Sequence, residues 1–210
     1  MSLYPGGIFI EPFPLESTGG KVWDASFKFL EFLLRLEQFN GCSGQRVLEL
    51  GSGCGWLGMR VGRKFPSWTV VTSERGSMGA LRCLNHNLGL NTIANVSSIE
   101  LDWSDLSSDV KSRGWDFIIG CELVYSYDGA RLLPKVIADL LRGTSTVCYY
   151  AHSLNRFESV DEVLLSEFRR NQLNVKVVHG RENVFDDESI GSFNSLFNDL
   201  ELVIFKITVS

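Results

Sequence analysis

Short apolar runs alternate along this chain with longer stretches in which apolar residues recur at helical spacing. The runs that predict buried strands are 47–50, 69–72, 115–120 and 146–151, with weaker ones at 96–99, 175–178 and 202–209. The stretches that predict helices between them are 57–64, 78–88, 130–141 and 160–170. Continuous apolar strands that alternate with helices are typical of an α/β sheet covered by helices on both faces.

The first part of the chain departs from this alternation. Residues 1–20 are rich in Gly and Pro, and their one apolar run, Ile8–Ile10, predicts an edge strand or an extended arm. Asp24 is the predicted N-cap of a first helix. The apolar stripe of that helix is predicted to consist of Phe27, Leu30, Phe32, Leu34 and Leu36.

The last part of the chain predicts how the sheet closes. Only the polar residues 181–198, which carry no helical stripe, separate the last two predicted strands, so these strands are expected to pair antiparallel. The sequence shows no repeat and no linker. We therefore expect one domain over residues 1–210, with an arm at 1–20, a cofactor-binding core at 21–150 and substrate-side elements at 151–210.

Composition narrows the range of functions. The 210 residues carry a net charge of −5, which argues against nucleic-acid binding through a basic face. Five cysteines without a CxxC pair predict free thiols in a reducing compartment, so we expect the protein in the cytoplasm, with the nucleus as a second location. We also expect a monomer. No apolar run reaches the ~18 residues of a membrane span. His86, His152 and His179 lack the spacing of a metal site, so no metal is expected.

The stretch VLELGSGCGWLG fits two kinds of cofactor loop. Gly53, Gly55 and Gly58 have the GxGxxG spacing of a dinucleotide-binding turn. Gly51, Gly53 and Gly55, with Glu49 before them, instead have the ExGxGxG form that holds S-adenosylmethionine. Ligands in such sheets bind at the carboxyl ends of the strands, which is where this stretch lies.

The charge of Glu49 favours the second cofactor. A dinucleotide would place its pyrophosphate in the loop, and a carboxylate ~4–6 Å away would cost on the order of 1–4 kcal/mol. S-adenosylmethionine carries a sulfonium and an ammonium group, so the same carboxylate attracts the ligand or orders the loop that binds it. The alternative is that Glu49 points to solvent and that the glycines form an ordinary turn.

Acids and aromatic residues follow the other predicted strands. Glu74 is placed to accept ribose hydroxyls, and its alternative is a solvated acid at a strand end. In ELDWSD, Trp103 is placed to cover an adenine and Asp102 to accept its exocyclic amine, while packing in the core is the alternative for the Trp. Trp23 either covers the amino-acid end of the cofactor or holds the first helix down.

The segment GCELVY, after the fourth main strand, is the candidate acceptor site. Glu122 and Tyr125 are three residues apart, so a single turn of backbone lets both face a pocket beside the methyl group of the bound cofactor. The Asn-Pro-Pro-Tyr motif of enzymes that methylate planar amines is absent. An acid with a Tyr suits an extended cationic acceptor, because the carboxylate attracts an ammonium and the ring lines its aliphatic stem.

The segments TGGKVWDA, VLELGSGCG, VTSE, LDW and GCELVY, in this order and spacing, resemble the seven-β-strand protein-lysine methyltransferases of methyltransferase family 16. That family modifies calmodulin, elongation factors, seventy-kilodalton chaperones and valosin-containing protein. The resemblance covers about Thr18 to Tyr150 and fades beyond it. It implies a class I methyltransferase fold, Rossmann-like, with a seven-stranded, mostly parallel sheet and an antiparallel last strand.

The resemblance also implies cofactor contacts. The residues that it assigns to S-adenosylmethionine are Trp23, the Gly51-Ser52-Gly53 turn, Glu74, Trp103 and Cys121. Two positions depart from the usual pattern, since Glu122 stands where Asp is common and Cys121 where a small Ala is common. The implied partner is a protein substrate such as a chaperone or an elongation factor.

The expected reaction is in-line methyl transfer to a lysine amine, with donor and acceptor aligned within ~3–3.5 Å. Glu122 is assigned to docking or to fixing its loop rather than to general-base catalysis, because a carboxylate favours the ammonium form. Tyr125 is expected to shape the acceptor channel, and Arg156 to contact the acceptor or form a surface salt bridge.

Three other functions stay open at this point. One is a methyltransferase that acts on a small molecule or on another side chain such as histidine. Another is a catalytically inactive, cofactor-binding scaffold, which the presence of Glu122 and Tyr125 argues against. An NAD-dependent oxidoreductase is disfavoured by Glu49.

Overall fold

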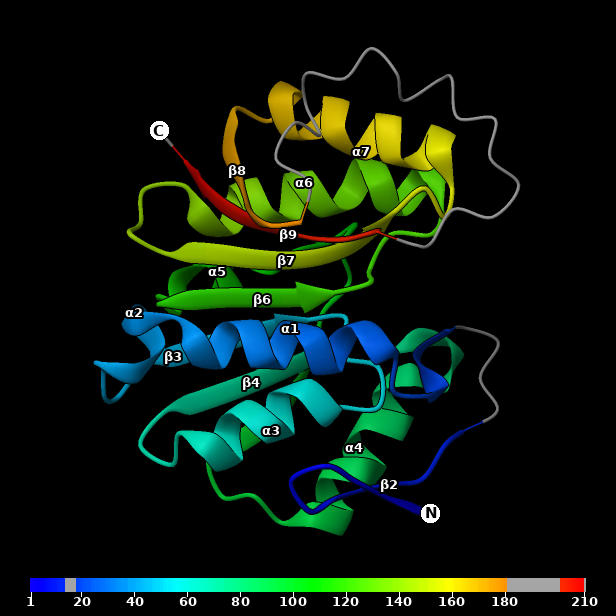
Figure 1. The fold of residues 1–210 in the computed structure, drawn as a ribbon, viewed down its shortest axis with the longest axis vertical. Coiled ribbons are helices and arrows are strands. Elements are labelled where there is room, and N and C mark those ends of the chain that lie inside the picture. Colours follow the sequence, from blue (N-terminus) through cyan, green and yellow to red (C-terminus); the bar gives the residue numbers. More distant parts are fainter. Residues whose placement is uncertain (14–17, 181–200, 210) are drawn as a thin grey trace. The chain divides into compact units, whose positions relative to one another are not determined.

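A computed structural model describes residues 1–13, 18–180 and 201–209 and places them in two units, residues 1–121 and 122–210 (Figure 1). Each unit has its own strands and helices. The expectation of one domain over the whole chain stays a prediction.

The strands of the first unit follow the apolar runs of the sequence. They are β3 (Arg46–Leu50), β4 (Thr69–Glu74), β5 (Val96–Glu100) and β6 (Phe117–Cys121). Their order is β5-β4-β3-β6, and each neighbouring pair is parallel, with Val47 opposite both Val70 and Phe117. In β3 every residue from Val47 to Leu50 is buried, as expected for a strand with both faces covered.

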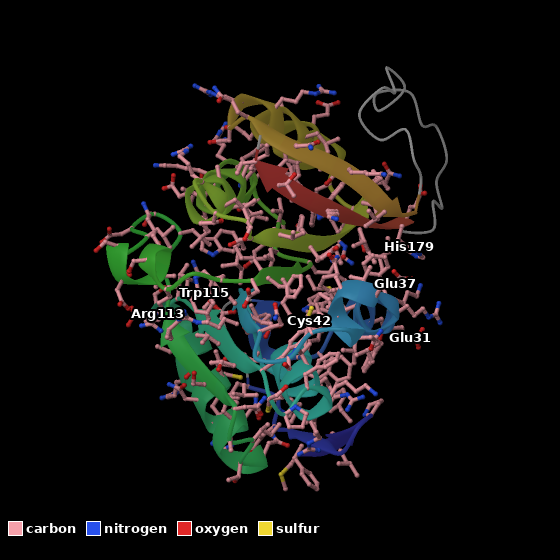
Figure 2. All side chains as sticks on the ribbon, turned by 90° about the vertical axis from the view of Figure 1, so that its left-hand side faces the viewer. Glu31, Glu37, Cys42, Arg113, Trp115 and His179 are labelled. Carbon is pink, nitrogen blue, oxygen red and sulfur yellow. The ribbon has the colours of Figure 1, made fainter. Side chains whose placement is uncertain are left out.

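Helices pack around these strands, and Figure 1 shows α1 and α3 in front of them. The helical segments of this unit are η1 (Thr18–Gly20), α1 (Asp24–Arg35), α2 (Glu37–Asn40), α3 (Trp56–Lys64), η2 (Ser77–Gly79), α4 (Ala80–Asn91) and α5 (Ser108–Ser112). Glu31 and Glu37 extend outward from α1 and α2 (Figure 2).

The apolar face of α1 differs from its prediction. Its buried residues are Phe29, Leu30 and Leu33, so of the five predicted stripe residues only Leu30 is buried. The predicted set advanced mostly in steps of two, whereas a helix turns 100° per residue and buries positions three and four apart. The N-cap is Trp23, with Asp24 in the first turn, where its negative charge complements the helix dipole.

The N-terminal segment forms a hairpin of its own. Strands β1 (Ser2–Tyr4) and β2 (Ile8–Ile10) pair antiparallel in a separate two-stranded sheet, so the run at 8–10 is a strand but not an edge of the main sheet. Ile8 and Ile10 are fully buried, and β2 lies beside α4 (Figure 1).

The described part of the second unit contains three strands in the order β7-β9-β8. These are β7 (Val147–Leu154), β8 (Leu173–His179) and β9 (Glu201–Val209), and β9 is antiparallel to both neighbours. The prediction of an antiparallel last strand is therefore confirmed. Helices α6 (Tyr127–Leu141) and α7 (Glu158–Arg170) lie alongside each other (Figure 1). The polar stretch 181–198, for which no helix was predicted, lies outside the described residues.

Two predictions about classes of residue can be compared with the structure. All five cysteines lie in described positions, none forms a disulfide, and Cys54, Cys83 and Cys148 are buried. In the part of the chain that the structure describes, no helix has the length and apolar character needed to cross a membrane.

Candidate functional site

The glycine loop connects the end of β3 to the start of α3. Gly51, Gly53 and Gly55 all have left-handed backbone angles, with φ of 56°, 56° and 84°. Only glycine adopts this region without a steric penalty, so the three glycines set the path of the loop. The loop lies against the end of β4, because the Ser52 N–H donates to the Ser73 carbonyl oxygen at 2.9 Å.

Other segments approach this loop so closely that side chains would not fit. A Cβ atom built on Gly53 would lie 2.9 Å from the carbonyl oxygen of Gly19, and one on Gly55 would lie 2.7 Å from Cδ1 of Leu84. The first neighbour is backbone and has little freedom to move away. The loop is therefore a backbone surface, bordered by η1 on one side and by α4 on another.

Glu49 lies behind the loop rather than at its mouth. Its side chain is buried, with the residue 3% exposed, and its Oε2 accepts the Gly58 N–H at 3.0 Å. Burial raises the pKa of Glu49 to about 8, against the opposing effect of hydrogen bonds from Ser52 and Gly58. The carboxyl group is thus mostly protonated at neutral pH, and the argument from its negative charge is wrong. The other role predicted for it, ordering the loop, is the one that its contacts support.

Glu74 reaches the loop from the end of β4. Its Oε1 accepts the Gly53 N–H at 2.8 Å and its Oε2 accepts the Arg75 N–H at 3.2 Å. Burial raises the pKa of Glu74, while these backbone hydrogen bonds and Arg75 oppose the shift. A carboxylate has about four lone-pair positions, so two remain for further donors such as ribose hydroxyls.

Two serines, the buried Ser73 and the partly buried Ser52, connect β3, β4 and the loop. The Ser73 hydroxyl donates to the Glu49 carbonyl at 2.7 Å, and the Ser73 N–H donates to the Ser52 hydroxyl at 3.0 Å. The sequence analysis included Ser52 but missed Ser73. Its only signal was a small polar residue near the end of a predicted buried strand, where a buried hydroxyl requires a partner.

The segment after β5 carries the residues expected at an adenine. Asp102 is exposed, and its Oδ1 accepts both the N–H and the hydroxyl of Ser104, at 2.8 and 2.6 Å. These hydrogen bonds lower the pKa of Asp102 and close a local turn. Trp103 is half-buried, and the Leu101 N–H joins this segment to the Glu74 carbonyl at 2.9 Å.

Trp23 and Cys121 are connected through α1. The Ser26 N–H donates to the Trp23 carbonyl at 3.0 Å, and the Ser26 hydroxyl lies 3.8 Å from the Cys121 sulfur at the end of β6. Lys21 Nζ lies 4.3 Å from the centre of the Trp23 ring. All ten residues predicted to contact the cofactor lie in the first unit. Nine of them lie at or just beyond the carboxyl ends of its strands, whereas Trp23 is the N-cap of α1.

Glu122 begins the second unit, in a strained backbone conformation. Its φ of 55° costs a non-glycine residue roughly 1–2 kcal/mol. The turn is held because the Glu122 N–H donates to the Ala151 carbonyl at 2.9 Å. The side chain is 5% exposed, with Oε1 accepting the Ser153 hydroxyl at 2.7 Å and Oε2 paired with Arg156 at 3.0 Å. Tyr125, the other predicted acceptor residue, is 45% exposed.

A buried polar chain that the sequence analysis missed lies on the other face of β7. The Tyr150 hydroxyl lies 2.9 Å from His152 Nδ1, and His152 Nε2 lies 2.8 Å from Asp161 Oδ1. The second oxygen of Asp161 accepts the Asn155 N–H at 2.8 Å, next to Arg156 in sequence. The strand alternation in YYAHSL places Tyr150 and His152 on one face, which was the available signal.

Comparisons with known proteins agree with the family resemblance found in the sequence. Residues 8–168 match a family model described as lysine methyltransferase. Protein N-lysine methyltransferase METTL21A of Danio rerio is 27% identical over 158 residues, which is 75% of this chain and 70% of that protein. EEF1A lysine methyltransferase 3 of Xenopus tropicalis is 30% identical over 125 residues, or 55% of this chain and 50% of that protein. A UPF0665 family protein of Schizosaccharomyces pombe is 27% identical over 66% of this chain, which spans only 44% of that relative's length.

Solved structures agree on the fold. The delta-N METTL16 MTase domain superposes with a TM-score of 0.64 at 12% identity, covering 97% of this chain and 90% of that one. At this identity the likeness shows the fold alone. The predicted fold class, a mostly parallel seven-stranded methyltransferase sheet, is confirmed.

Proposed function

Because this chain belongs to the lysine methyltransferase family that its residues 8–168 match, we propose that it transfers a methyl group from S-adenosylmethionine to lysine side chains of a protein substrate. METTL21A, one of its relatives, is named for N-lysine methylation of proteins. The chain spans half or less of two relatives described above, so the substrate is part of the proposal.

The contact between Glu74 and the Gly53 N–H carries the choice of cofactor. A dinucleotide-binding loop offers its backbone N–H groups to a pyrophosphate. Here the Gly53 N–H is taken by a carboxylate, the Ser52 N–H by the Ser73 carbonyl and the Gly55 N–H by the Ser52 carbonyl. An anion would meet oxygen atoms rather than N–H donors, whereas a cationic ligand would not be repelled.

The loop also fits the shape of such a cofactor. Its glycines present bare backbone, in a space that a side chain on Gly53 would fill. We assign Glu74 to the ribose hydroxyls, Asp102 and Trp103 to the adenine, and Trp23 and Cys121 to the amino-acid end. S-adenosylmethionine supplies a methyl group on a positively charged sulfur when it is bound.

Glu122 is assigned to fixing the acceptor loop. Its two carboxylate oxygens are engaged by Ser153 and Arg156, so it holds the turn that carries Tyr125. The acceptor lysine has to lose its proton, because only about 0.1% is neutral at pH 7.4 with an ordinary pKa near 10.4. A lone carboxylate would oppose that loss, and the Arg156 guanidinium offsets its charge.

Calorimetry tests the cofactor. We expect S-adenosylmethionine to bind and NAD to show no heat of binding at the same concentration. The matched variant is Glu74→Gln, which keeps a hydrogen-bond acceptor for the Gly53 N–H but removes the carboxyl group assigned to the ribose, and it should bind S-adenosylmethionine more weakly. Binding of NAD by the wild-type chain would refute the assignment.

Methyl labelling tests the substrate class. Cell extract and purified EEF1A, the protein named in one relative, are incubated with methyl-labelled S-adenosylmethionine and the enzyme. Mass spectrometry of the labelled band is expected to find methyl-lysine. Label in a soluble metabolite or on histidine would instead support the alternative substrates.

A further inference from the structure

The N-terminal strap, defined as residues 2–13 with 18–20, is fastened to the first unit by side-chain amides. Asn91 Oδ1 accepts the Phe9 N–H at 2.8 Å, and Asn91 Nδ2 donates to the Phe9 carbonyl at 2.7 Å. Asn87 makes the same pair of hydrogen bonds with Glu11: its Oδ1 accepts the Glu11 N–H at 2.8 Å, and its Nδ2 donates to the Glu11 carbonyl at 3.3 Å. Each amide thus pairs with both backbone groups of one strap residue.

The spacing of the two amides matches the strap. Asn87 and Asn91 are four residues apart on α4, a rise of about 6 Å, and lie on one face of the helix. Phe9 and Glu11 are two residues apart along an extended strand, about 6.6 Å, and point their backbone groups to the same side. The helix therefore substitutes for a neighbouring strand over this length.

The amides fix where the strap sits along α4. Ile8 and Ile10, which are fully buried, hold the strap against the unit by apolar packing. Such packing is non-directional and tolerates small displacements. Hydrogen bonds that pair both groups of a residue are directional, so they set the position.

That position reaches the glycine loop through a short series of contacts. Two residues beyond Glu11, the Phe13 N–H donates to the Gly20 carbonyl at 3.3 Å. The neighbouring Gly19 carbonyl oxygen is the atom that a Cβ on Gly53 would meet at 2.9 Å. The strap's last turn is therefore one wall of the loop.

We propose that Asn87 and Asn91 are positioning residues for S-adenosylmethionine, acting by holding the Gly19–Gly20 turn against Gly53. The proposal rests on the cofactor assignment made under the proposed function. It extends the set of residues that control cofactor affinity to the C-terminal half of α4.

The chain offers a matched control at the other end of the strap. Arg63 Nη1 donates to the Gly6 and Gly7 carbonyls at 2.8 and 2.7 Å, so it also makes two strap hydrogen bonds. Those bonds hold the hairpin turn, which precedes β2 and contacts no residue of the glycine loop in the series above. Asn91→Leu and Arg63→Met each remove two hydrogen bonds to the strap, the first at Phe9 and the second at the hairpin turn.

The test compares the S-adenosylmethionine Kd and the thermal midpoint of Asn87→Leu, Asn91→Leu and Arg63→Met. We expect Kd to rise about tenfold in the two Asn variants and less than twofold in Arg63→Met, for similar losses of midpoint. Unchanged Kd in Asn91→Leu, or an equal rise in Arg63→Met, would overturn the proposal. Asn91 is half-buried at the end of α4, so its variant carries the test if Asn87→Leu does not fold.

The cofactor assignment can fail separately. If the wild-type chain does not bind S-adenosylmethionine, the proposed function is wrong, whatever the variants do. In that case, amide hydrogen exchange tests whether the strap holds the glycine loop, independently of cofactor binding. Faster exchange at Gly53 in Asn91→Leu but not in Arg63→Met supports the strap's role in holding the loop, and equal exchange overturns it.

Discussion

The acids of the glycine loop and the acid of the β6–α6 turn are stabilised in opposite ways. Glu49 and Glu74 are held by backbone N–H groups, and burial raises the pKa of both. Glu122 is nearly as hidden, yet its oxygens are met by a guanidinium and a hydroxyl. Burial shifts a carboxyl group held by neutral donors toward its protonated form, whereas a guanidinium beside a carboxyl group favours the carboxylate. Acids at the ends of strands in one chain therefore do not share one electrostatic environment, and each has to be interpreted from its own partners.

The largest expected effect concerns Glu49 and pH. Its folded pKa of about 8 lies above the ordinary 4.5, so the folded state holds a proton that the unfolded state releases between these values. The free energy of unfolding is therefore expected to fall as pH rises through this window, by roughly 5 kcal/mol in total from this group. Glu49→Gln does not ionise and keeps an acceptor for the Gly58 N–H, so urea unfolding at pH 5.5, 7 and 8.5 should show a flatter profile. A residual slope of the same sign is expected from Glu74. An unchanged profile in the variant would place a charged Glu49 in the folded state and break the comparison.

The next effect concerns Arg156. Arg156→Met leaves the Glu122 carboxylate, whose side chain is 5% exposed, without its cation. Removing one partner of a buried pair is strongly destabilising, and because Arg156 is itself 29% exposed we expect about 2–3 kcal/mol. Urea unfolding measures the loss. The double variant Glu122→Gln with Arg156→Met should recover about half of it, because no unpaired charge remains. No recovery would show that the loss comes from packing of the arginine stem.

A smaller effect is expected at the glycine loop itself. Gly53→Ala adds a Cβ at φ 56°, 2.9 Å from a backbone oxygen, so the loop and η1 have to separate. We expect the S-adenosylmethionine Kd to rise about 30-fold, or about 2 kcal/mol, by calorimetry. Gly44→Ala is the control, since Gly44 has φ 73° but nothing within 4 Å of its built Cβ. It shares the backbone strain and should bind the cofactor normally. Equal weakening in both variants would trace the effect to strain rather than to the close approach.

The smallest effect is expected from Tyr125→Phe. Because Tyr125 is 45% exposed, the change should alter stability by no more than about 0.5 kcal/mol. If the Tyr125 ring lines the acceptor channel, removing its hydroxyl should raise the KM for the protein substrate by a few fold. Cofactor binding should be unchanged. Steady-state kinetics with the labelled acceptor measure both. A change in cofactor Kd would show that Tyr125 affects cofactor binding and would contradict its assignment to the acceptor channel.

Much of the fold was predictable because buried strands can be recognised in the sequence as apolar runs. The predicted run 47–50 became β3, and 202–209 became most of β9, since continuous burial leaves few polar positions. The predicted strand at 115–120 begins later, at Phe117. Trp115 instead packs in the loop before it, where its Nε1 donates to the Val110 carbonyl at 2.9 Å (Figure 2). Boundaries of this kind depend on tertiary partners that local pattern does not contain.

The candidate site was predictable in position but less so in chemistry. The strand-end rule places Glu74, the glycine loop and Glu122 where the structure has them. The charge of Glu49 was not predictable, because its burial is set by the packing of α3 and β4 against β3, which the local pattern does not contain. The Asn87 and Asn91 contacts were missed for a related reason, since an asparagine on a helix gives no sign that it pairs with backbone about 80 residues away.

The amides on α4 also bear on how the chain behaves in concentrated solution. A strand whose N–H and C=O groups face outward is a template on which other polypeptides can add, and natural proteins cap or interrupt such borders. On the side of β2 away from β1, Phe9 and Glu11 have both groups occupied by Asn91 and Asn87. These two helix residues thereby block the addition of a strand from another molecule at that edge. The edge is protected against self-association without an additional strand.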